Sequence, residues 1–211
     1  MTRAELGLPP DAVVFCCFNA NHKIRPAMFD VWMRLLLEVP QSVLWLRDGG
    51  QEMIGRFRHQ AYIRGVDPAR LHFAGRMASR AHHLGRQAQA DIFLDTWPYN
   101  AHATAIDAIS AGLPLLTLRG QSFASRIAAG FLTNLDLEEL IANTLEEYQA
   151  VALTLAREPW RLHRIRQRLA QAREKSKLFD ISAVARHLEA AFVEMDRRAR
   201  CGEGPGHFRV A

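Results

Sequence analysis

The sequence is poor in the features that define several common classes of protein. It has three cysteines, and two of them, Cys16 and Cys17, are adjacent and would point to opposite faces of a strand, so no disulfide framework or metal quartet is visible. No apolar run approaches the length that crosses a bilayer, and residues 1–10 lack the basic-then-apolar design of a signal peptide. We therefore expect a soluble, cytoplasmic protein with no membrane partner.

Two further absences exclude classes of ligand. No G-x-G-x-x-G follows the first apolar run, where a nicotinamide-binding domain would carry it. The 27 Lys and Arg are interspersed with 22 Asp and Glu, although the formal net charge is +5 and the pI is about 9.6. This charge favours an anionic ligand such as a phosphate-bearing small molecule. Because no long basic run or known motif accompanies it, we do not expect a nucleic-acid partner.

What the sequence does contain is an alternation of short apolar runs with segments of helical period, over 211 residues that are 49% hydrophobic. This pattern predicts one α/β domain, a Rossmann-like parallel sheet flanked by helices. Strands are expected at residues 13–18, 42–46, 70–74, 91–95 and 114–118. Helices are expected between them at residues 26–37, 51–64, 79–90, 102–111 and 122–129. The β-rich runs stop after Leu132, so the remainder is predicted as helices at 137–143, 145–157, 159–174 and 181–198, with a frayed tail from 201 to 211.

The first predicted helix begins at Pro26, a residue suited to the first helical position. Its apolar side chains at helical spacing predict a stripe that faces the core, made up of Phe29, Trp32, Met33, Leu36 and Leu37.

A parallel sheet of this kind binds ligands outside the carboxyl ends of its strands, so the residues after each strand are the candidate site residues. Lys23 follows the first strand and is placed for a phosphate, or it is an ordinary solvated lysine. Ser79 is a candidate helix cap, and Arg80, His83 and Arg86 then share neighbouring helical positions. These three could stack on and hydrogen-bond a base, or they could form a wet helix face. His82 and His83 point in different directions, so metal binding is not expected.

The fourth predicted strand is followed by a proline-containing turn and a helix that begins in small residues, Asp95-Thr96-Trp97-Pro98-Tyr99-Asn100-Ala101-His102-Ala103-Thr104. Free amides at such a helix start can bind a diphosphate. His102 and Thr104 could add polar contacts, and Asp107 could hold ribose hydroxyls. Alternatively, His102 and Thr104 cap the helix and Asp107 favours its positive end. Ser122, after the fifth strand, is either a ligand contact or a structural helix cap.

The order of these segments resembles the C-terminal catalytic lobe of the SPINDLY-like and protein O-GlcNAc transferases, glycosyltransferase family 41. The resemblance runs from about Leu8 to Phe179 through LPPDAVVFCCFN, SVLWL, RLHFAGRM and GQSFASRIAAGFL, and its most specific part is ADIFLDTWPYNAHATAIDAISAGLPLLTL. It implies a GT-B fold, of which this chain is the donor lobe. The expected domains are a UDP-sugar-binding lobe at 8–180, a C-terminal helix at 181–199 that packs on or across the lobe, and a flexible tail at 200–211.

The resemblance also implies a role for each candidate residue. Lys23 would be the catalytic lysine on the UDP diphosphate. The uracil would lie among Ala78, Arg80, His83 and Arg86, the diphosphate at His102, Ala103 and Thr104, and the ribose at Asp107. The chain departs from the family at three positions. Ala20 stands where the family has Asn or Gln, Ala103 where it has Thr, and Arg80 where animal members have Lys. The loss of one hydroxyl costs about 1 kcal/mol of binding, so donor binding should weaken and not vanish.

The expected activity is an inverting, metal-independent transfer of GlcNAc from UDP to a protein Ser or Thr hydroxyl, with no cofactor. The lack of an Asp-x-Asp motif agrees with metal independence. In the family the protein acceptor is bound by an N-terminal lobe and tetratricopeptide helices, so we expect this chain to be incomplete without them. The alternative is a truncated or divergent lobe that binds UDP or a UDP-sugar without transferring it. An exposed apolar stripe on the helix at 181–198 would favour a homodimer.

Overall fold

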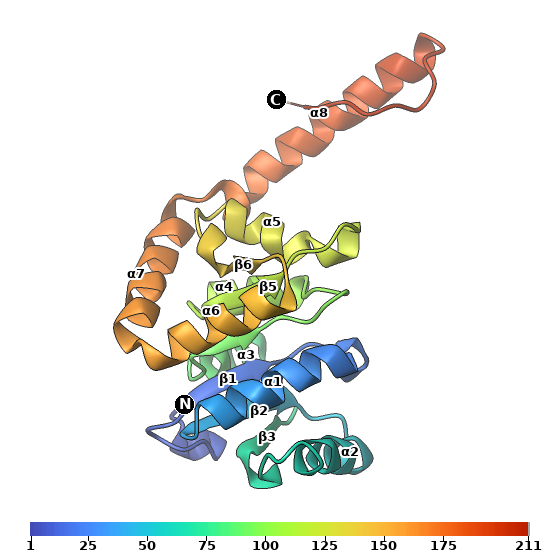
Figure 1. Cartoon of the computed structure of the whole chain (residues 1–211). Coiled ribbons are helices and arrows are strands. Elements are labelled where there is room, and N and C mark those ends of the chain that lie inside the picture. The colour runs from blue at the N-terminus through green and yellow to red at the C-terminus, as the bar shows by residue number, and fades with distance from the viewer. Residues whose placement is uncertain (211) are drawn as a thin grey trace. The chain divides into compact units, whose positions relative to one another are not determined.

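A six-stranded parallel sheet forms the centre of residues 1–174 in the computed structural model, which describes residues 1–210 (Figure 1). The strand order is β3-β2-β1-β4-β5-β6, so the sheet grows first in one direction and then in the other, with the reversal between β1 and β4. The strands are β1 (Val13–Cys17), β2 (Ser42–Arg47), β3 (Leu71–Ala74), β4 (Ile92–Leu94), β5 (Leu115–Leu118) and β6 (Ile141–Ala142). The predicted fold class is confirmed.

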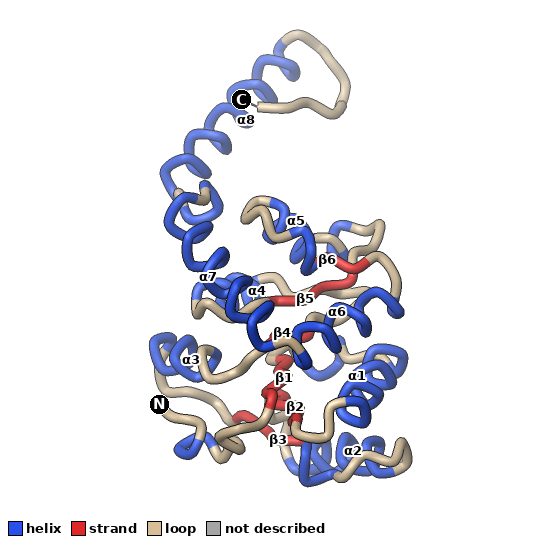
Figure 2. The backbone as a smooth tube through the Cα atoms, turned by 60° about the vertical axis from the view of Figure 1, so that its left-hand side comes forward, coloured by secondary structure: helices blue, strands red, loops and turns tan. Residues whose placement is uncertain are grey.

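The central strands are apolar along their whole length because helices cover both faces of the sheet. Phe15 of β1 pairs with Leu44 of β2 on one side and with Ile92 of β4 on the other, and all three are fully buried. Figure 2 shows α1, α2 and α6 on one side of the strands and α3 and α4 on the other. The α-helices are α1 (Pro26–Glu38), α2 (Gln51–Tyr62), α3 (Arg80–Gln87), α4 (Ala103–Ser110), α5 (Ile127–Thr133), α6 (Leu145–Arg157), α7 (Pro159–Lys175) and α8 (Ile181–Arg200).

Helix α1 begins at Pro26 as predicted, and its buried face is wider than the predicted stripe. Phe29, Trp32, Met33 and Leu36 are buried, but Leu37 is 49% exposed, so its assignment to the core was wrong. The buried face also includes Val31 and Leu35. At 100° per residue, these two residues centre the face near Trp32, which places Leu37 almost opposite.

The sequence prediction was wrong in two segments near the end of the sheet. Residues 137–143 were predicted as a helix, but a 3₁₀ turn at Glu138–Leu140 leads into the short edge strand β6. The helix expected at 122–129 is a 3₁₀ turn at Phe123–Ser125 followed by α5. Both stretches contain helix-favouring residues, and pairing of β6 with β5 overrides that preference in the first. The remaining 3₁₀ turns lie at Ala4–Leu6, Asn21–Lys23, Pro68–Arg70 and Lys177–Phe179.

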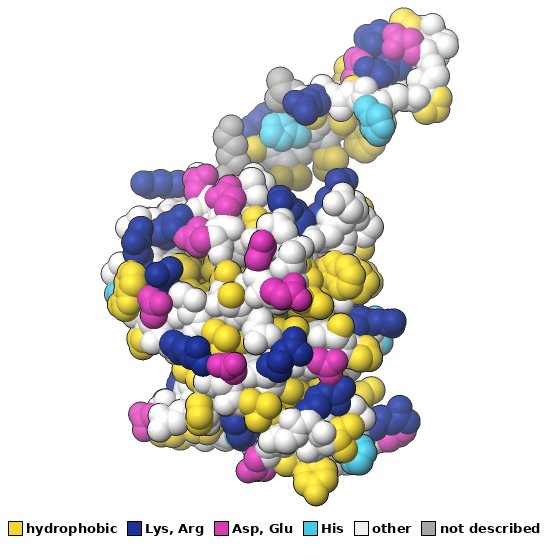
Figure 3. All heavy atoms as spheres, in the orientation of Figure 1, with side chains coloured by type: hydrophobic (Ala, Val, Ile, Leu, Met, Phe, Trp, Pro, Cys, Tyr) yellow, Lys and Arg dark blue, Asp and Glu magenta, His cyan; other side chains and the backbone are white. Residues whose placement is uncertain are grey.

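The chain divides into two compact units, Met1–Glu174 and a second unit that begins at Lys175 and contains α8. The predicted boundaries at 180 and 199, and the frayed tail, stay predictions. Helix α8 carries the expected apolar side chains, and Val184, Leu188, Phe192 and Met195 are all exposed. Within residues 1–210, none of the helices is both long and apolar enough to span a bilayer. Figure 3 shows Lys and Arg interspersed with Asp and Glu over the face of the sheet-containing unit that it displays.

Candidate functional site

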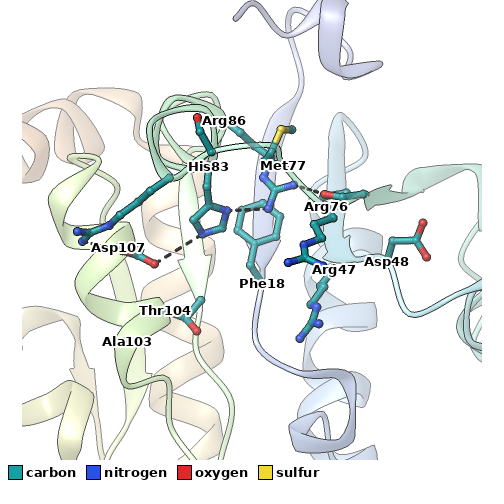
Figure 4. Close-up of a pocket in the computed structure, with 14 residues that line it drawn as sticks. Phe18, Arg47, Asp48, Arg76, Met77, His83, Arg86, Ala103, Thr104 and Asp107 are labelled. Carbon is teal, nitrogen blue, oxygen red and sulfur yellow. Dashed lines mark hydrogen bonds and ion pairs between the residues drawn. The ribbon is translucent and has the colours of Figure 1, made fainter.

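A pocket of about 600 Å³ opens at the carboxyl ends of β1, β2 and β3, between α3 and the start of α4 (Figure 4). Ligands of open α/β sheets bind at this edge, near the point where the strand order reverses. Several separate segments of the chain line the pocket, because all strands of a parallel sheet end at the same edge. The lining residues are Phe18, Arg47, Asp48, Ala74, Gly75, Arg76, Met77, Ser79, Arg80, His83, Arg86, Ala103, Thr104 and Asp107.

On the α3 side of the pocket, one histidine is held between a guanidinium and a carboxylate. Arg86 Nη2 lies 2.8 Å from His83 Nδ1, and its Nη1 donates to the Gly75 carbonyl at 2.6 Å. A guanidinium only donates, so Nδ1 accepts and the ring carries its hydrogen on Nε2. That nitrogen lies 2.9 Å from the Gln87 side-chain amide, which accepts from it through its oxygen, and 3.7 Å from Asp107 Oδ2 (Figure 4). Burial, and then the charge of Arg86, lower the pKa of His83, so the ring is neutral near pH 7.

The Asp107 carboxylate joins α4 to α3 across the pocket. It accepts from Arg80 Nη2 at 3.2 Å as well as facing His83. Arg80 is 72% exposed, so this ion pair is open to solvent and can rearrange around a ligand. Asp107 therefore combines a fixed place in the pocket with accessible acceptor oxygens, as binding of a vicinal diol requires.

The amino terminus of α4 enters the pocket at Ala103 and Thr104. The amides of Ala103 and Thr104 have no acceptor within the helix, and they carry the positive end of the helix dipole. His102 is the N-cap residue, but its side chain makes no capping hydrogen bond, and its Nε2 is buried with no hydrogen-bond partner among the described residues. The alternative in which His102 caps the helix is therefore wrong. On α3, by contrast, Ser79 accepts from the His82 amide at 3.2 Å, so that predicted cap is confirmed.

Lys23 lies beside the turn that leads into α4. Its Nζ donates to the Asn100 carbonyl at 3.1 Å and lies 3.7 Å from the centre of the Tyr99 ring. The Tyr99 ring in turn contacts the His102 ring, with centroids 5.3 Å apart. Burial lowers the pKa of Lys23, and the charge of Asp95 opposes that shift. The lysine is thus a partly buried cation in contact with the turn, and the alternative of an ordinary solvated lysine is wrong.

The turn itself is organised by the buried carboxylate of Asp95. Asp95 Oδ1 accepts from the amides of Thr96 at 2.8 Å and Ala101 at 2.7 Å, and from Asn19 Nδ2 at 3.1 Å. Its Oδ2 accepts from Thr117 Oγ1 at 2.7 Å. Burial nevertheless raises the pKa of Asp95 to about 6, because four neutral donors only partly replace water around the charge.

Six of the predicted site residues line the same pocket: Arg80, His83, Arg86, Ala103, Thr104 and Asp107. Ala78 lies between two lining residues, Met77 and Ser79, whereas Lys23 and His102 lie at the turn and not in the lining. The roles assigned to these residues stay predictions. Ser122 Oγ lies 2.9 Å from Ser125 Oγ and does not cap a helix through its side chain.

Several lining residues had no predicted role, among them Phe18, Arg47, Asp48, Arg76 and Met77. The rule that ligand contacts lie at strand ends could have found all five. Phe18 follows β1, and Arg47 and Asp48 are the last residue of β2 and the one after it. Arg76 and Met77 come two and three positions after β3. The hydrogen bonds of Asp95 with Asn19 and Thr117 could not be found in this way, since they join residues that lie far apart in the sequence.

Comparison with known proteins identifies the family of this chain. The model of glycosyl transferase family 41 matches residues 1–188. This chain belongs to that family. The fold of its sheet-containing unit is accordingly the Rossmann-like lobe of a GT-B glycosyltransferase.

Other members of family 41 are similar over almost the whole chain. The UDP-N-acetylglucosamine–peptide N-acetylglucosaminyltransferase of Caenorhabditis elegans is 36% identical over 98% of this chain, and a probable enzyme of that name, SEC, from Arabidopsis thaliana is 34% identical over 99%. The chain spans only 18% and 21% of those two proteins. A mutant of the Thermobaculum terrenum O-GlcNAc transferase superposes with a TM-score of 0.83 at 32% identity, over 90% of this chain and 39% of that one.

Proposed function

We propose that this chain is the donor lobe of an inverting protein O-GlcNAc transferase and that UDP-GlcNAc binds in the pocket at the carboxyl edge of the sheet. The observation that carries the proposal is the convergence of His83, Arg86 and Asp107 with the start of α4 on one pocket of about 600 Å³. Membership of glycosyl transferase family 41, and the names of its relatives, support the choice of donor.

The pocket offers suitable chemistry for each part of the nucleotide. The neutral His83 ring presents a flat face beside the Arg86 guanidinium, which suits a pyrimidine base, with Arg80 and the Ala78 backbone nearby. Asp107 can accept hydrogen bonds from the ribose hydroxyls. The free amides of Ala103 and Thr104 suit the diphosphate, with His102 Nε2 as a further polar group.

In the proposed reaction, the acceptor hydroxyl attacks C1 of GlcNAc while the bond from C1 to the UDP oxygen breaks. The hydroxyl releases its proton to solvent water, and the electron pair of the broken bond stays on the departing diphosphate oxygen as negative charge. Lys23 and the amino terminus of α4 are placed to stabilise that charge, and such stabilisation lowers the barrier most when the donors are already in position. The proposal needs no metal ion or cofactor, because these groups supply the positive charge.

The protein acceptor, a partner lobe with tetratricopeptide helices, and a possible homodimer remain part of the proposal. The exposed apolar side chains of α8 support association with a further lobe or a second copy. The cytoplasm is the proposed compartment, since Cys16, Cys17 and Cys201 are free thiols and a reducing compartment preserves them.

Calorimetric titration with UDP and UDP-GlcNAc tests the proposal directly. We expect submillimolar binding of UDP by the wild-type chain. Lys23→Ala and Asp107→Ala should each weaken it by roughly tenfold or more, because each removes a charged hydrogen-bond partner of the ligand. Lys175→Ala and Asp11→Ala are matched controls and should bind as the wild type does. No detectable binding by the wild type would contradict the assignment.

Transfer to a protein acceptor separates the donor lobe from a complete enzyme. We expect no glycosylated product from this chain alone, and product after the chain is joined to the N-terminal part of a family relative. Product from the chain alone would show that the acceptor side is also present. Binding of UDP-GlcNAc without product in the joined protein would favour the alternative of a lobe that only binds the donor.

A further inference from the structure

The turn at residues 95–101 lies between Lys23 and the start of α4, and a single buried carboxylate closes it. Asp95 ends the buried run of β4 and is fully buried. It accepts the amide of the next residue and the amide of Ala101, six positions on, so its Oδ1 spans the whole turn. A buried charge costs several kcal/mol unless hydrogen bonds replace its lost water. The Asp95 carboxylate therefore depends on the hydrogen bonds that it accepts, and these are the bonds that close the turn.

The residues of the turn depend on this closure. Asn19 donates to both Asp95 Oδ1 at 3.1 Å and Thr96 Oγ1 at 2.8 Å, and Thr96 Oγ1 donates to the Tyr99 carbonyl at 2.7 Å. Asn100 Nδ2 donates to the Thr96 carbonyl at 2.8 Å. These bonds set the direction of the Asn100 carbonyl, which is the acceptor of Lys23 Nζ.

We propose that Asp95 is a positioning residue for the diphosphate end of the donor site: its carboxylate closes the turn that carries the Asn100 carbonyl, the acceptor of Lys23 Nζ, and leads into the start of α4. This inference rests on the proposed UDP-sugar function. Asp95 is fully buried beneath the turn and is not among the residues that line the pocket. It acts on the site through the turn and through the charge of Lys23.

The other ionisable groups around Asp95 do not compensate for it. Cys17 of β1 and Tyr148 of α6 both interact with Asp95, and burial raises the pKa of each well above its ordinary value, so both stay neutral at pH 7. Burial lowers the pKa of Lys23, whereas the charge of Asp95 raises it. Asp95 is therefore the anion that supports the charge of Lys23 near neutral pH.

An asparagine at this position separates the two roles. Asp95→Asn keeps Oδ1 as the acceptor for Thr96 and Ala101, and its Nδ2 can donate to Thr117 Oγ1 once that hydroxyl turns to accept. The turn stays closed while the charge is lost. Asp91→Asn is the matched control, because Asp91 stands just before the same strand at the opposite edge of the sheet.

Titration of Lys23 by NMR in the ligand-free protein is the first measurement. The chain has three lysines, Lys23, Lys175 and Lys177, so the ¹³Cε signal of Lys23 is identified by its absence from Lys23→Met. We expect the pKa of Lys23 to fall by roughly half a unit to one unit in Asp95→Asn, as for the loss of one partly screened charge. It should not change in Asp91→Asn. An unchanged pKa of Lys23 in Asp95→Asn would overturn the electrostatic role of Asp95.

Binding of UDP is the second measurement. At pH 7 Asp95→Asn should bind UDP within roughly threefold of the wild type, because the turn is kept and Lys23 is still charged. As the pH rises towards 9 its affinity should fall earlier than that of the wild type. The uracil itself loses a proton in alkali, which changes UDP binding by any variant. At each pH, the UDP affinity of the wild type and of Asp95→Asn is therefore divided by the affinity of the same protein carrying Lys23→Met. If these two ratios depend on pH in the same way, the electrostatic role is overturned.

Asp95→Ala tests closure of the turn and should lose UDP affinity by roughly tenfold or more. Wild-type affinity in a folded Asp95→Ala would overturn the positioning role. If circular dichroism shows that this variant does not fold, Asn19→Ala takes its place, because it removes the donor to Asp95 Oδ1 and Thr96 Oγ1; wild-type UDP affinity in that variant would overturn the positioning role. Failure of the wild type to bind UDP would contradict the proposed function and leave the Lys23 titration as the separate test of Asp95.

Discussion

Strand β4 has an aspartate just before it and another just after it, and the two carboxylates have opposite surroundings. Asp91, at the amino edge of the sheet, pairs with Arg3 at 2.8 Å and Arg166 at 3.2 Å and accepts the Val14 amide at 2.8 Å. Asp95, at the carboxyl edge, receives only neutral donors. Lys23 lies near Asp95 but contacts the Asn100 carbonyl instead.

The different surroundings of Asp91 and Asp95 indicate that the amino edge of the sheet stabilises the fold and that the carboxyl edge is suited to binding a ligand. At the amino edge the positive charges are used within the protein, since Arg3 also donates to the carbonyls of Pro10, Ala12 and Gln89 and so fixes the N-terminal segment. At the carboxyl edge, the Lys23 ammonium and the α4 amides are not neutralised by a direct carboxylate contact. An ammonium group and free amides that no carboxylate contacts directly are available to an anionic ligand.

The largest expected effect concerns the pH dependence of stability. Burial raises the pKa of Asp95 to about 6 from an ordinary value of 3.8, so the folded state holds a proton that the unfolded state releases. The stabilising effect of protonation is complete below about pH 4 and is lost as the pH rises through about 6. We expect the free energy of unfolding of the wild type to fall relative to that of Asp95→Asn by on the order of 3 kcal/mol between pH 4 and 7. Urea unfolding at several pH values measures this, and parallel curves for the two proteins would contradict it.

A smaller effect on stability is expected for Asp91, just before the amino end of β4. Asp91→Ala leaves Arg3 and Arg166 without their carboxylate and the Val14 amide without its acceptor. The side chain of Asp91 is 17% exposed and those of the arginines 22% and 36%, so solvent reduces the cost to about 2 kcal/mol. Chemical denaturation measures the loss, and UDP affinity of the folded protein should be unchanged. Weaker UDP binding would show that the two edges are not independent.

The smallest effect on stability is expected for Arg80. Its ion pair with Asp107 is largely exposed, so Arg80→Ala should change the free energy of unfolding by less than about 0.5 kcal/mol. UDP affinity should nevertheless fall, because Arg80 lies in the pocket lining. A thermal melt and a UDP titration of the same variant check both statements. A large loss of stability with unchanged affinity would place Arg80 in the structural class and remove the contrast between the edges.

Much of the fold could be predicted because local sequence carries it. The apolar runs of β1, β2 and β5, the proline that opens α1 and the serine that caps α3 are local signals, and the structure agrees with them. The two-residue strand β6 was missed, because a strand that short has no periodicity to detect. Leu37 was misplaced because the centre of a helix's buried face depends on what the helix packs against.

The candidate site, like the fold, was predictable from the sequence only in part. The sequence by itself determined which residues follow the strands and begin the helices, and therefore most of the pocket lining, because the edge of a parallel sheet is set by chain direction. Only the tertiary structure decided that Asp95 is buried and closes the turn, and that Lys23 points at the Asn100 carbonyl. Burial and hydrogen bonding between distant segments determine the charge of these groups, and neither depends on local sequence alone.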